Sequence, residues 1–267
     1  MTADIVTITS GKGGVGKTTA TANLSVALAA LGNRVVCIDA DIGLRNLDVV
    51  MGLENRIVYD LVDVIEGRCK LRQAMIKDKR QENLFLIPAA QTRDKTAVSP
   101  RDMIQLTNEL RQNCDWIVID SPAGIERGFR NALAPADIVL IITNPEVSAV
   151  RDADRIIGII EAEEKGPGKL ILNRIKPEMI RRGQMLGIED VLEILAIDLI
   201  GAVPDDESVI VASNQGTPVA LDAKSRAGRA FMHIAMRLEG EDVPFDPMDG
   251  ADGFLGRFAR LMRSGGD

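Results

Sequence analysis

The stretch SGKGGVGKTT, from Ser10 to Thr19, decides the fold. It matches the phosphate-binding pattern G-x-x-x-x-G-K-[ST], and it lies between an apolar run, Ile5–Thr9, and a helical pattern that begins near Lys17. Its glycines let backbone N–H groups approach a phosphate closely, and a helix that starts there points the positive end of its dipole at the anion. The segment therefore predicts a nucleotide site that contains Gly11, Lys12, Gly13, Gly14, Val15, Gly16, Lys17, Thr18 and Thr19.

Three side chains near this loop predict its chemistry. Lys17 is expected to reach the β- and γ-phosphates, and the hydroxyl of Thr18 is expected to ligate Mg²⁺. The apolar run Asp115–Asp120 ends in a carboxylate. Because parallel strands end at a common edge of the sheet, Asp120 should lie near Thr18 and bind Mg²⁺ through its waters.

Two more carboxylates close the apolar run Arg34–Asp39 or follow it directly. Asp39 is expected to support the magnesium shell. Asp41 is expected to position the attacking water, because phosphoryl transfer needs positioning more than a strong base. The single histidine, His233, falls in a predicted late helix. For either aspartate the alternative is a role as a helix cap or turn residue.

Short β-branched runs alternate with helical patterns along residues 1–238. Near-continuous apolar runs indicate strands that are buried on both faces, and hence a mostly parallel sheet covered by helices. Besides the three runs already named, strands are predicted at Leu84–Pro88, Asp137–Thr143, Lys169–Asn173 and Leu199–Pro204, and helices at Lys17–Leu31, Tyr59–Glu66, Pro100–Gln112, Val147–Glu164, Ile188–Leu195 and Lys224–Leu238. The pattern predicts a doubly wound α/β fold of the P-loop NTPase type, with about seven or eight strands.

Composition disfavours several classes of protein. The 267 residues carry a net charge of −7, which argues against a protein that coats nucleic acid, so no specific nucleic acid is expected as a partner. The three cysteines form no CxxC pair, which disfavours a zinc or iron–sulfur site. The N-terminus lacks a signal-peptide pattern, and no long uninterrupted apolar window predicts a transmembrane helix. These features predict a cytoplasmic protein.

The character of the chain changes after residue 238. Residues 239–252, EGEDVPFDPMDGAD, are rich in acidic residues, proline and glycine, and they predict a flexible linker. Residues 253–267 have one apolar face flanked by arginines, which predicts an amphipathic helix at an anionic membrane surface. The expected membrane-binding residues are Phe254, Leu255, Arg257, Phe258, Arg260, Leu261 and Met262. A helix that packs in the core and a docking peptide for a protein partner are the alternatives.

A single tail of this size binds a membrane weakly. One partly inserted apolar face gains about 4 kcal/mol, which corresponds to a millimolar affinity. Two tails on one dimer would strengthen attachment by about 10²–10⁴ through effective concentration. Membrane attachment is therefore expected to depend on dimerisation.

The loop contains a second lysine, Lys12, and KGGVGKT resembles the deviant Walker A signature of the MinD/ParA ATPase family. DADIGLRNLDVVMGL (Asp39–Leu53) and TNPEVSAVRDADRI (Thr143–Ile156) are similar to the septum-determining branch of that family, and the similarity runs through the whole chain. The resemblance implies that ATP is the nucleotide, that the ATP state is a homodimer and that Lys12 reaches the nucleotide of the partner subunit. By position it also implies Asn46 in the nucleotide-sensing switch, Asn173, Arg174, Pro204 and Asp205 around the adenine, and Asp154 near the dimer face.

The same resemblance implies a function. Members of this branch attach reversibly to the inner face of the cell membrane when ATP is bound, and they recruit the division inhibitor MinC. A regulator such as MinE stimulates hydrolysis and would bind around Val150–Arg155. Three alternatives stay open: a ParA-type partition ATPase, which should have a basic surface; a flagellar-number regulator of the same group, which should carry an N-terminal extension; and a metabolic phosphotransferase on this fold, which should have a substrate pocket.

Overall fold

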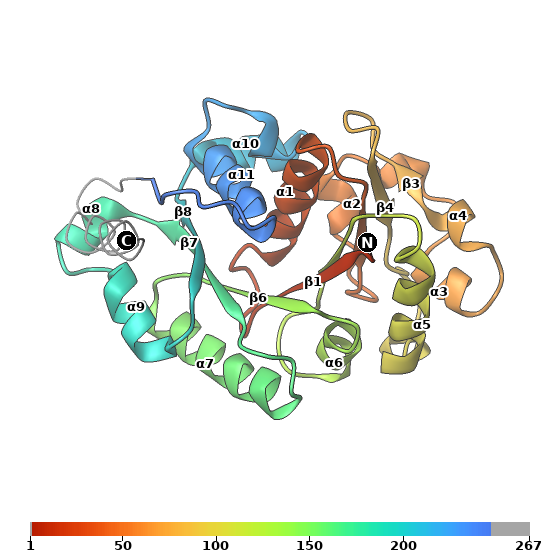
Figure 1. The fold of residues 1–267 in the computed structure, drawn as a ribbon, viewed down its shortest axis with the longest axis horizontal. Coiled ribbons are helices and arrows are strands. Elements are labelled where there is room, and N and C mark those ends of the chain that lie inside the picture. The colour runs from red at the N-terminus through yellow and green to blue at the C-terminus, as the bar shows by residue number, and fades with distance from the viewer. Residues whose placement is uncertain (1, 247–267) are drawn as a thin grey trace, which may run out of the picture.

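The predicted doubly wound α/β fold is confirmed. The structure, a computed structural model, describes residues 2–246 and contains an eight-stranded sheet in the order β3-β4-β2-β5-β1-β6-β7-β8, with helices on both faces (Figure 1). All neighbouring strands in this sheet pair in parallel except β3 and β4. Strand β1 (Asp4–Thr9) lies between β5 and β6. Because the strand order reverses there, the carboxyl end of β1 is where this architecture binds ligands.

The seven predicted strands are all present. The strands after β1 are β2 (Val35–Asp39), β3 (Ile76–Lys77), β4 (Leu84–Ile87), β5 (Trp116–Asp120), β6 (Ile138–Thr143), β7 (Lys169–Ile175) and β8 (Leu199–Pro204). Strand β3 was not predicted, because two residues are too few to show a period.

The six predicted helices are present, with ends within two residues of those expected. The helices are α1 (Lys17–Ala30), α2 (Leu47–Val50), α3 (Leu61–Ile65), α4 (Leu71–Ala74), α5 (Pro100–Leu110), α6 (Arg127–Leu133), α7 (Val147–Ala162), α8 (Pro177–Arg181), α9 (Ile188–Leu195), α10 (Glu207–Asn214) and α11 (Arg226–Leu238), with short 3₁₀ turns η1 (Glu54–Arg56), η2 (Lys95–Ala97) and η3 (Val219–Leu221). The unpredicted helices α2, α4, α6, α8 and α10 have at most eight residues, too few for a clear helical period.

Both faces of the sheet are buried, as the apolar runs predicted. In β1, Val6 and Ile8 pack in the cluster under α1 and α11, whereas Ile5 packs in the cluster under α5 on the opposite face. Helices α7 and α9 cover a third cluster over β6, β7 and β8 (Figure 1). After the exposed Asp4, every residue of β1 is buried, which is the pattern of a strand covered by helices on both faces.

Local sequence signals set the ends of several helices. Ser99 and Asp102 form a capping box at the start of α5, and the carboxylate of Asp60 caps α3. Gly32 follows the C-cap of α1 with φ +101°, the left-handed conformation expected of a glycine at this position.

Part of the predicted linker is held against the domain. The guanidinium of Arg237, in α11, donates to the carbonyl oxygens of Ile200 (2.9 Å), Val243 (3.0 Å) and Pro244 (3.0 Å). It also lies 4.0 Å from the ring centroid of Phe245. Residues 247–252 of the predicted linker, together with the predicted membrane-binding helix 253–267, lie outside the described residues. Between residues 2 and 246, no helix combines the length and the apolar character needed to cross a bilayer.

Candidate nucleotide-binding site

The loop between β1 and α1 has a backbone conformation suited to phosphate. Gly14 (φ +80°) and Gly16 (φ +101°) are left-handed, which glycine adopts at little cost. Within residues 2–246, the N–H groups of Gly16, Lys17 and Thr18 donate to no protein acceptor. Because these donors stand at the N-terminus of the fourteen-residue helix α1, the helix dipole adds to their attraction for an anion. The loop therefore fits a phosphate group.

Two glycines of the loop allow close packing against neighbouring elements. A Cβ atom on Gly11 would lie 2.2 Å from the carbonyl oxygen of Asp152 in α7, and one on Gly16 would lie 2.4 Å from Nδ2 of Asn173. That same amide nitrogen donates to the carbonyl oxygen of Val15 at 2.7 Å. The loop is thus held between α7 and the end of β7, and side chains larger than glycine do not fit at these two positions.

Buried charged side chains lie behind the loop. Lys17 is 9% exposed, and its Nζ lies 3.7 Å from Oδ1 of Asp120. The hydroxyl of Thr21 donates to the same oxygen at 3.1 Å. Asp39 is the residue paired with Asp120 across β2 and β5, and both carboxylates are buried. Two carboxylates beside a single ammonium leave an excess of buried negative charge, which suits a divalent cation.

The pKa values of these carboxylates reflect that imbalance. Burial raises the pKa of Asp120, although Lys17 and the hydroxyls of Thr18 and Thr21 oppose the shift. Burial and the neighbouring Asp120 raise the pKa of Asp39 to about 7. A magnesium ion ligated by Thr18 and held through Asp120 would supply the missing positive charge, so the donor set fits the predicted metal.

The carboxylate of Asp39 also organises the segment that follows it. Its Oδ1 accepts the N–H of Asp41 at 3.0 Å, and its Oδ2 accepts those of Asn46 and Leu47, each at 3.1 Å. These bonds hold the turn before α2, so the turn role considered for Asp39 is confirmed. Its part in a magnesium shell stays a prediction, as does the positioning of water by the half-buried Asp41.

The four residues expected around the adenine line one cavity. Asn173, Arg174, Pro204 and Asp205 contribute to a cavity of ≈ 1050 Å³ that two residues of the phosphate loop also line. The register between β7 and β8 shifts around Asn173 and Arg174, and Arg174 has a left-handed φ of +55°. Such irregularities redirect side chains at the edges of binding sites. The cavity opens where the loop ends, which is the arrangement that a nucleotide needs.

Lys12 lies at the rim of the site rather than inside it. Its side chain is 45% exposed, and its Nζ lies 3.8 Å from a carboxylate oxygen of Glu146 and 3.4 Å from the hydroxyl of Ser148. Exposed pairs of this kind contribute about 0–1 kcal/mol, so they hold the side chain weakly. Lys12 is therefore available to a group outside its own subunit.

The structure does not bring every predicted residue into the cavity. Asn46 is exposed, and its place in the structure is set by the bond from its N–H to Asp39. On α7, Asp154 and Arg155 are exposed whereas Val150 is buried. Asn46, Asp154 and Arg155 therefore lie on the surface, Val150 packs in the core, and none of the four lines the cavity.

Sequence reasoning missed some contributors to the site. Thr21 follows Lys17 by four residues, so helical periodicity alone places both on one face of α1 and could have identified it. Glu146 and Ser148 contact Lys12 only because α7 folds back beside the loop. No local signal in the sequence announces that contact.

The glycine loop, the buried Lys17–Asp120 pair and the adjoining cavity define a P-loop nucleotide-binding protein with a second loop lysine. A family model described as the CobQ/CobB/MinD/ParA nucleotide binding domain matches residues 6–219. The chain is 56% identical over 248 residues to the septum site-determining protein MinD of Bacillus subtilis, and the alignment covers 92% of each chain. The chain therefore belongs to the MinD family of septum site-determining proteins, and the resemblance stated from its motifs is confirmed.

Solved structures agree with this assignment. A chain of the MinC:MinD cell division protein complex of Aquifex aeolicus is 49% identical with a TM-score of 0.85, over 92% of this chain and 99% of that one. The septum site-determining protein MinD of Pyrococcus horikoshii, complexed with Mg-ADP, is 30% identical with a TM-score of 0.78, over 89% of this chain and 96% of that one. The fold is thus that of the family.

Proposed function

We propose that this chain is an ATP-hydrolysing protein that dimerises and attaches to the membrane in its ATP state, and that it thereby places the division septum. The observation that carries the proposal is the position of Lys12, an exposed cation at the rim of a buried phosphate site. A cation that acts across a dimer interface makes hydrolysis depend on association, as an arginine finger does. The weak contacts of Lys12 with its own subunit leave it available for this role.

Each residue around the phosphates has a separate role in binding or hydrolysis. Bound Mg²⁺ supplies positive charge that neutralises the phosphate oxygens. The N–H groups at the start of α1 and the ammonium of Lys17 hold those oxygens, while Thr18 and Asp120 hold the ion. Asp41 orients the attacking water from the end of β2, where the turn held by Asp39 places it. The Mg-ADP complex of the Pyrococcus horikoshii relative supports ATP and Mg²⁺ as the cofactors.

Attachment to the membrane rests on the predicted tail, residues 253–267. Its seven predicted membrane-binding residues form an apolar face with flanking arginines, which suits an anionic lipid surface. One tail is too weak to hold the protein, and two tails on a dimer are strong enough. We therefore infer a cytoplasmic protein that is attached reversibly and peripherally to the inner face of the cell membrane.

Partners follow from the same relatives. The Aquifex aeolicus complex pairs a MinD protein with MinC, which supports MinC as a partner of this chain. A MinE-like regulator is expected to bind α7 around residues 150–155, where Asp154 and Arg155 are exposed beside the site. The partition-ATPase and flagellar-regulator alternatives are not favoured, since relatives more than 50% identical over most of the chain are septum-determining proteins.

Co-sedimentation with anionic liposomes tests the proposal. The intact chain should pellet with Mg·ATP or a slowly hydrolysed analogue but not with Mg·ADP. A chain that ends at Asp252 should stay in the supernatant with every nucleotide while still hydrolysing ATP at its lipid-free rate. Equal pelleting of the intact chain in ADP and ATP would contradict the proposed switch.

A further inference from the structure

Two short helices meet at their carboxyl ends, far along the chain from each other. Gly52 (φ +65°) follows α2, and Gly216 (φ +61°) follows α10. A Cβ atom on Gly52 would lie 2.6 Å from the carbonyl oxygen of Gly216, and one on Gly216 would lie 2.5 Å from the Cα of Gly52. The two backbones are therefore in direct contact, and only glycine permits that approach.

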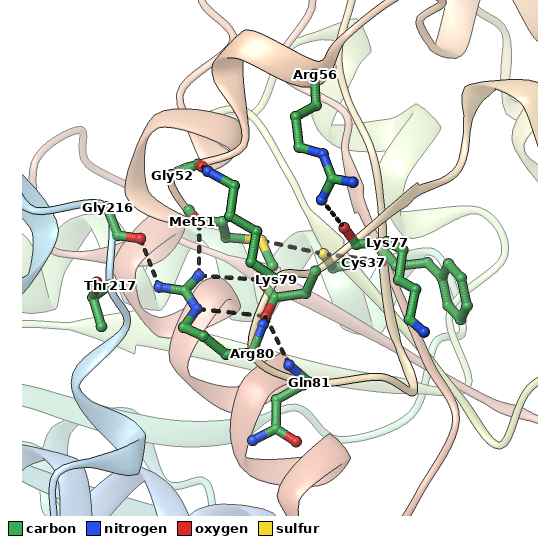
Figure 2. A network of polar contacts seen from close by, with 12 residues as sticks. Cys37, Met51, Gly52, Arg56, Lys77, Lys79, Arg80, Gln81, Gly216 and Thr217 are labelled. Carbon is green, nitrogen blue, oxygen red and sulfur yellow. Dashed lines mark hydrogen bonds and ion pairs between the residues drawn. The ribbon is translucent and has the colours of Figure 1, made fainter.

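Cations from the β3–β4 turn join these two helix ends (Figure 2). The guanidinium of Arg80 donates through Nη1 to the carbonyl oxygen of Gly216 and through Nη2 to that of Met51, both at 2.7 Å. Nζ of Lys79 donates to the carbonyl oxygen of Gly52 at 2.9 Å. Carbonyl groups at helix ends lack partners within the helix and carry partial negative charge, so two cations are the appropriate partners. We call these contacts the Arg80 clasp.

A buried carboxylate orients the clasp. Asp78 is 4% exposed, and its Oδ2 accepts from Nη2 of Arg80 at 3.0 Å. Its Oδ1 also accepts the backbone N–H groups of Arg80 (2.7 Å) and Gln81 (2.9 Å). Burial would raise the pKa of Asp78, but these bonds outweigh it and the pKa is lowered, so the charge persists at neutral pH. Asp78 therefore holds the guanidinium of Arg80 in the orientation in which it donates to the two carbonyl groups.

The opposite ends of the two helices stand at the two ends of the nucleotide site. Helix α2 begins at Leu47, whose N–H donates to the carboxylate of Asp39. Helix α10 begins at Glu207, which lines the ≈ 1050 Å³ cavity together with Asp205 and Asp206. One helix thus starts beside the carboxylates expected near the phosphates and the metal, and the other starts beside the cavity expected to hold the base.

We propose that the Arg80 clasp couples the phosphate end of the nucleotide site to its base end, with Arg80 as a positioning residue. The proposal rests on the proposed nucleotide binding. A shift of α2 that follows a change at Asp39 moves the carbonyl of Met51, and the shared guanidinium carries the shift to Gly216 and α10. The presence of a γ-phosphate then alters how firmly α10 closes the base cavity, although the two groups bind at different ends of the site.

Hydrogen exchange followed by mass spectrometry tests the coupling. In the intact chain, Mg·ATPγS should slow exchange in residues 207–217 about fivefold more than Mg·ADP does, a ratio at the lower end of typical allosteric couplings. In Arg80→Ala, both nucleotides should protect this segment equally. Arg80→Lys keeps the charge but cannot donate to both carbonyl groups, so most of the difference between Mg·ATPγS and Mg·ADP in the protection of residues 207–217 should disappear. This variant replaces Arg80→Ala in the test if the alanine variant folds poorly.

A matched control comes from η1, whose last residue, Arg56, binds the same hairpin. Arg56 donates to the carbonyl oxygen of Lys77 at 2.9 Å but contacts neither helix end, so Arg56→Ala should keep the fivefold difference (Figure 2). Sedimentation velocity measures the dimer fraction of each sample, so that protection caused by dimerisation is not mistaken for coupling between the two ends of the nucleotide site. Equal protection by the two nucleotides in the intact chain, or a difference that survives in Arg80→Ala, overturns the proposal. Failure of the intact chain to bind either nucleotide overturns the proposed function instead.

Discussion

Replacing Gly11 by alanine tests how closely the phosphate loop must approach α7. The added Cβ would lie 2.2 Å from the carbonyl oxygen of Asp152 and 2.4 Å from its carbonyl carbon. Both atoms are backbone, so the loop or the helix must move by roughly 1 Å to restore an ordinary contact. Overpacking of this kind costs about 1–3 kcal/mol. Since the same movement displaces the N–H groups that face the phosphates, we expect ADP affinity to fall by at least about tenfold.

Gly13 provides the matched control in the same loop, because a Cβ there would meet no atom within 4 Å. Thermal unfolding without nucleotide should show a lower Tm for Gly11→Ala and a Tm near that of the parent chain for Gly13→Ala. Titration with a fluorescent ADP analogue then measures the loss of affinity in Gly11→Ala. An unchanged Tm together with unchanged ADP affinity in Gly11→Ala would refute the packing that we describe.

Three other predictions concern the surroundings of the site. Arg237→Ala should cost about 2–4 kcal/mol, because three carbonyls lose a charged donor, and it should speed hydrogen exchange in residues 241–246; slow exchange there would contradict this. Thr21→Val removes a donor from the buried Asp120, so Mg²⁺ affinity measured by calorimetry should fall, at a stability cost of about 1–3 kcal/mol; wild-type values for both would count against the contact. At Asp206, hydrogen bonds outweigh burial and lower the pKa from its ordinary 3.8 to about 2. The stability that the Asp206 carboxylate contributes is complete above pH 3.8 and is lost as the pH falls through 2. Asp206→Ala should therefore lower the free energy of unfolding by about 1–2 kcal/mol at pH 7, and that free energy should change less between pH 4 and 2 than in the parent chain. Curves of unfolding free energy against pH that run parallel in the two proteins would refute this.

The sequence predicts those parts of the molecule that depend on local pattern. The apolar runs located seven strands, because burial on both faces leaves a continuous signal. The phosphate loop was recognisable because its glycines and Lys17 must occupy fixed positions to surround a phosphate. The rule that parallel strands end at one edge predicted Asp120 near Thr18, and the structure places its carboxylate 3.7 Å from the ammonium of Lys17, the residue before Thr18.

What the sequence could not predict depends on contacts between distant segments. The turn bonds of Asp39 were open to two interpretations, because the same residue type suits a metal shell and a turn. The contact between Gly52 and Gly216 joins residues more than 160 positions apart, and nothing near either glycine reveals it. Likewise, acidic and proline-rich composition predicted a flexible linker from residue 239, whereas Arg237 holds Val243 and Pro244 against the domain.

Sedimentation velocity of the intact chain is the most direct test of the central claim, that the γ-phosphate decides whether two subunits associate through Lys12. With Mg·ATPγS the chain should sediment as a dimer, and with Mg·ADP as a monomer. In the parent chain, Lys12 contacts its own subunit at 3.4 Å from Ser148 and 3.8 Å from Glu146. The Lys12→Ala variant should remain monomeric with both nucleotides while still binding them. Identical distributions of monomer and dimer with the two nucleotides, or a Lys12→Ala variant that dimerises as the parent chain does, would contradict the claim.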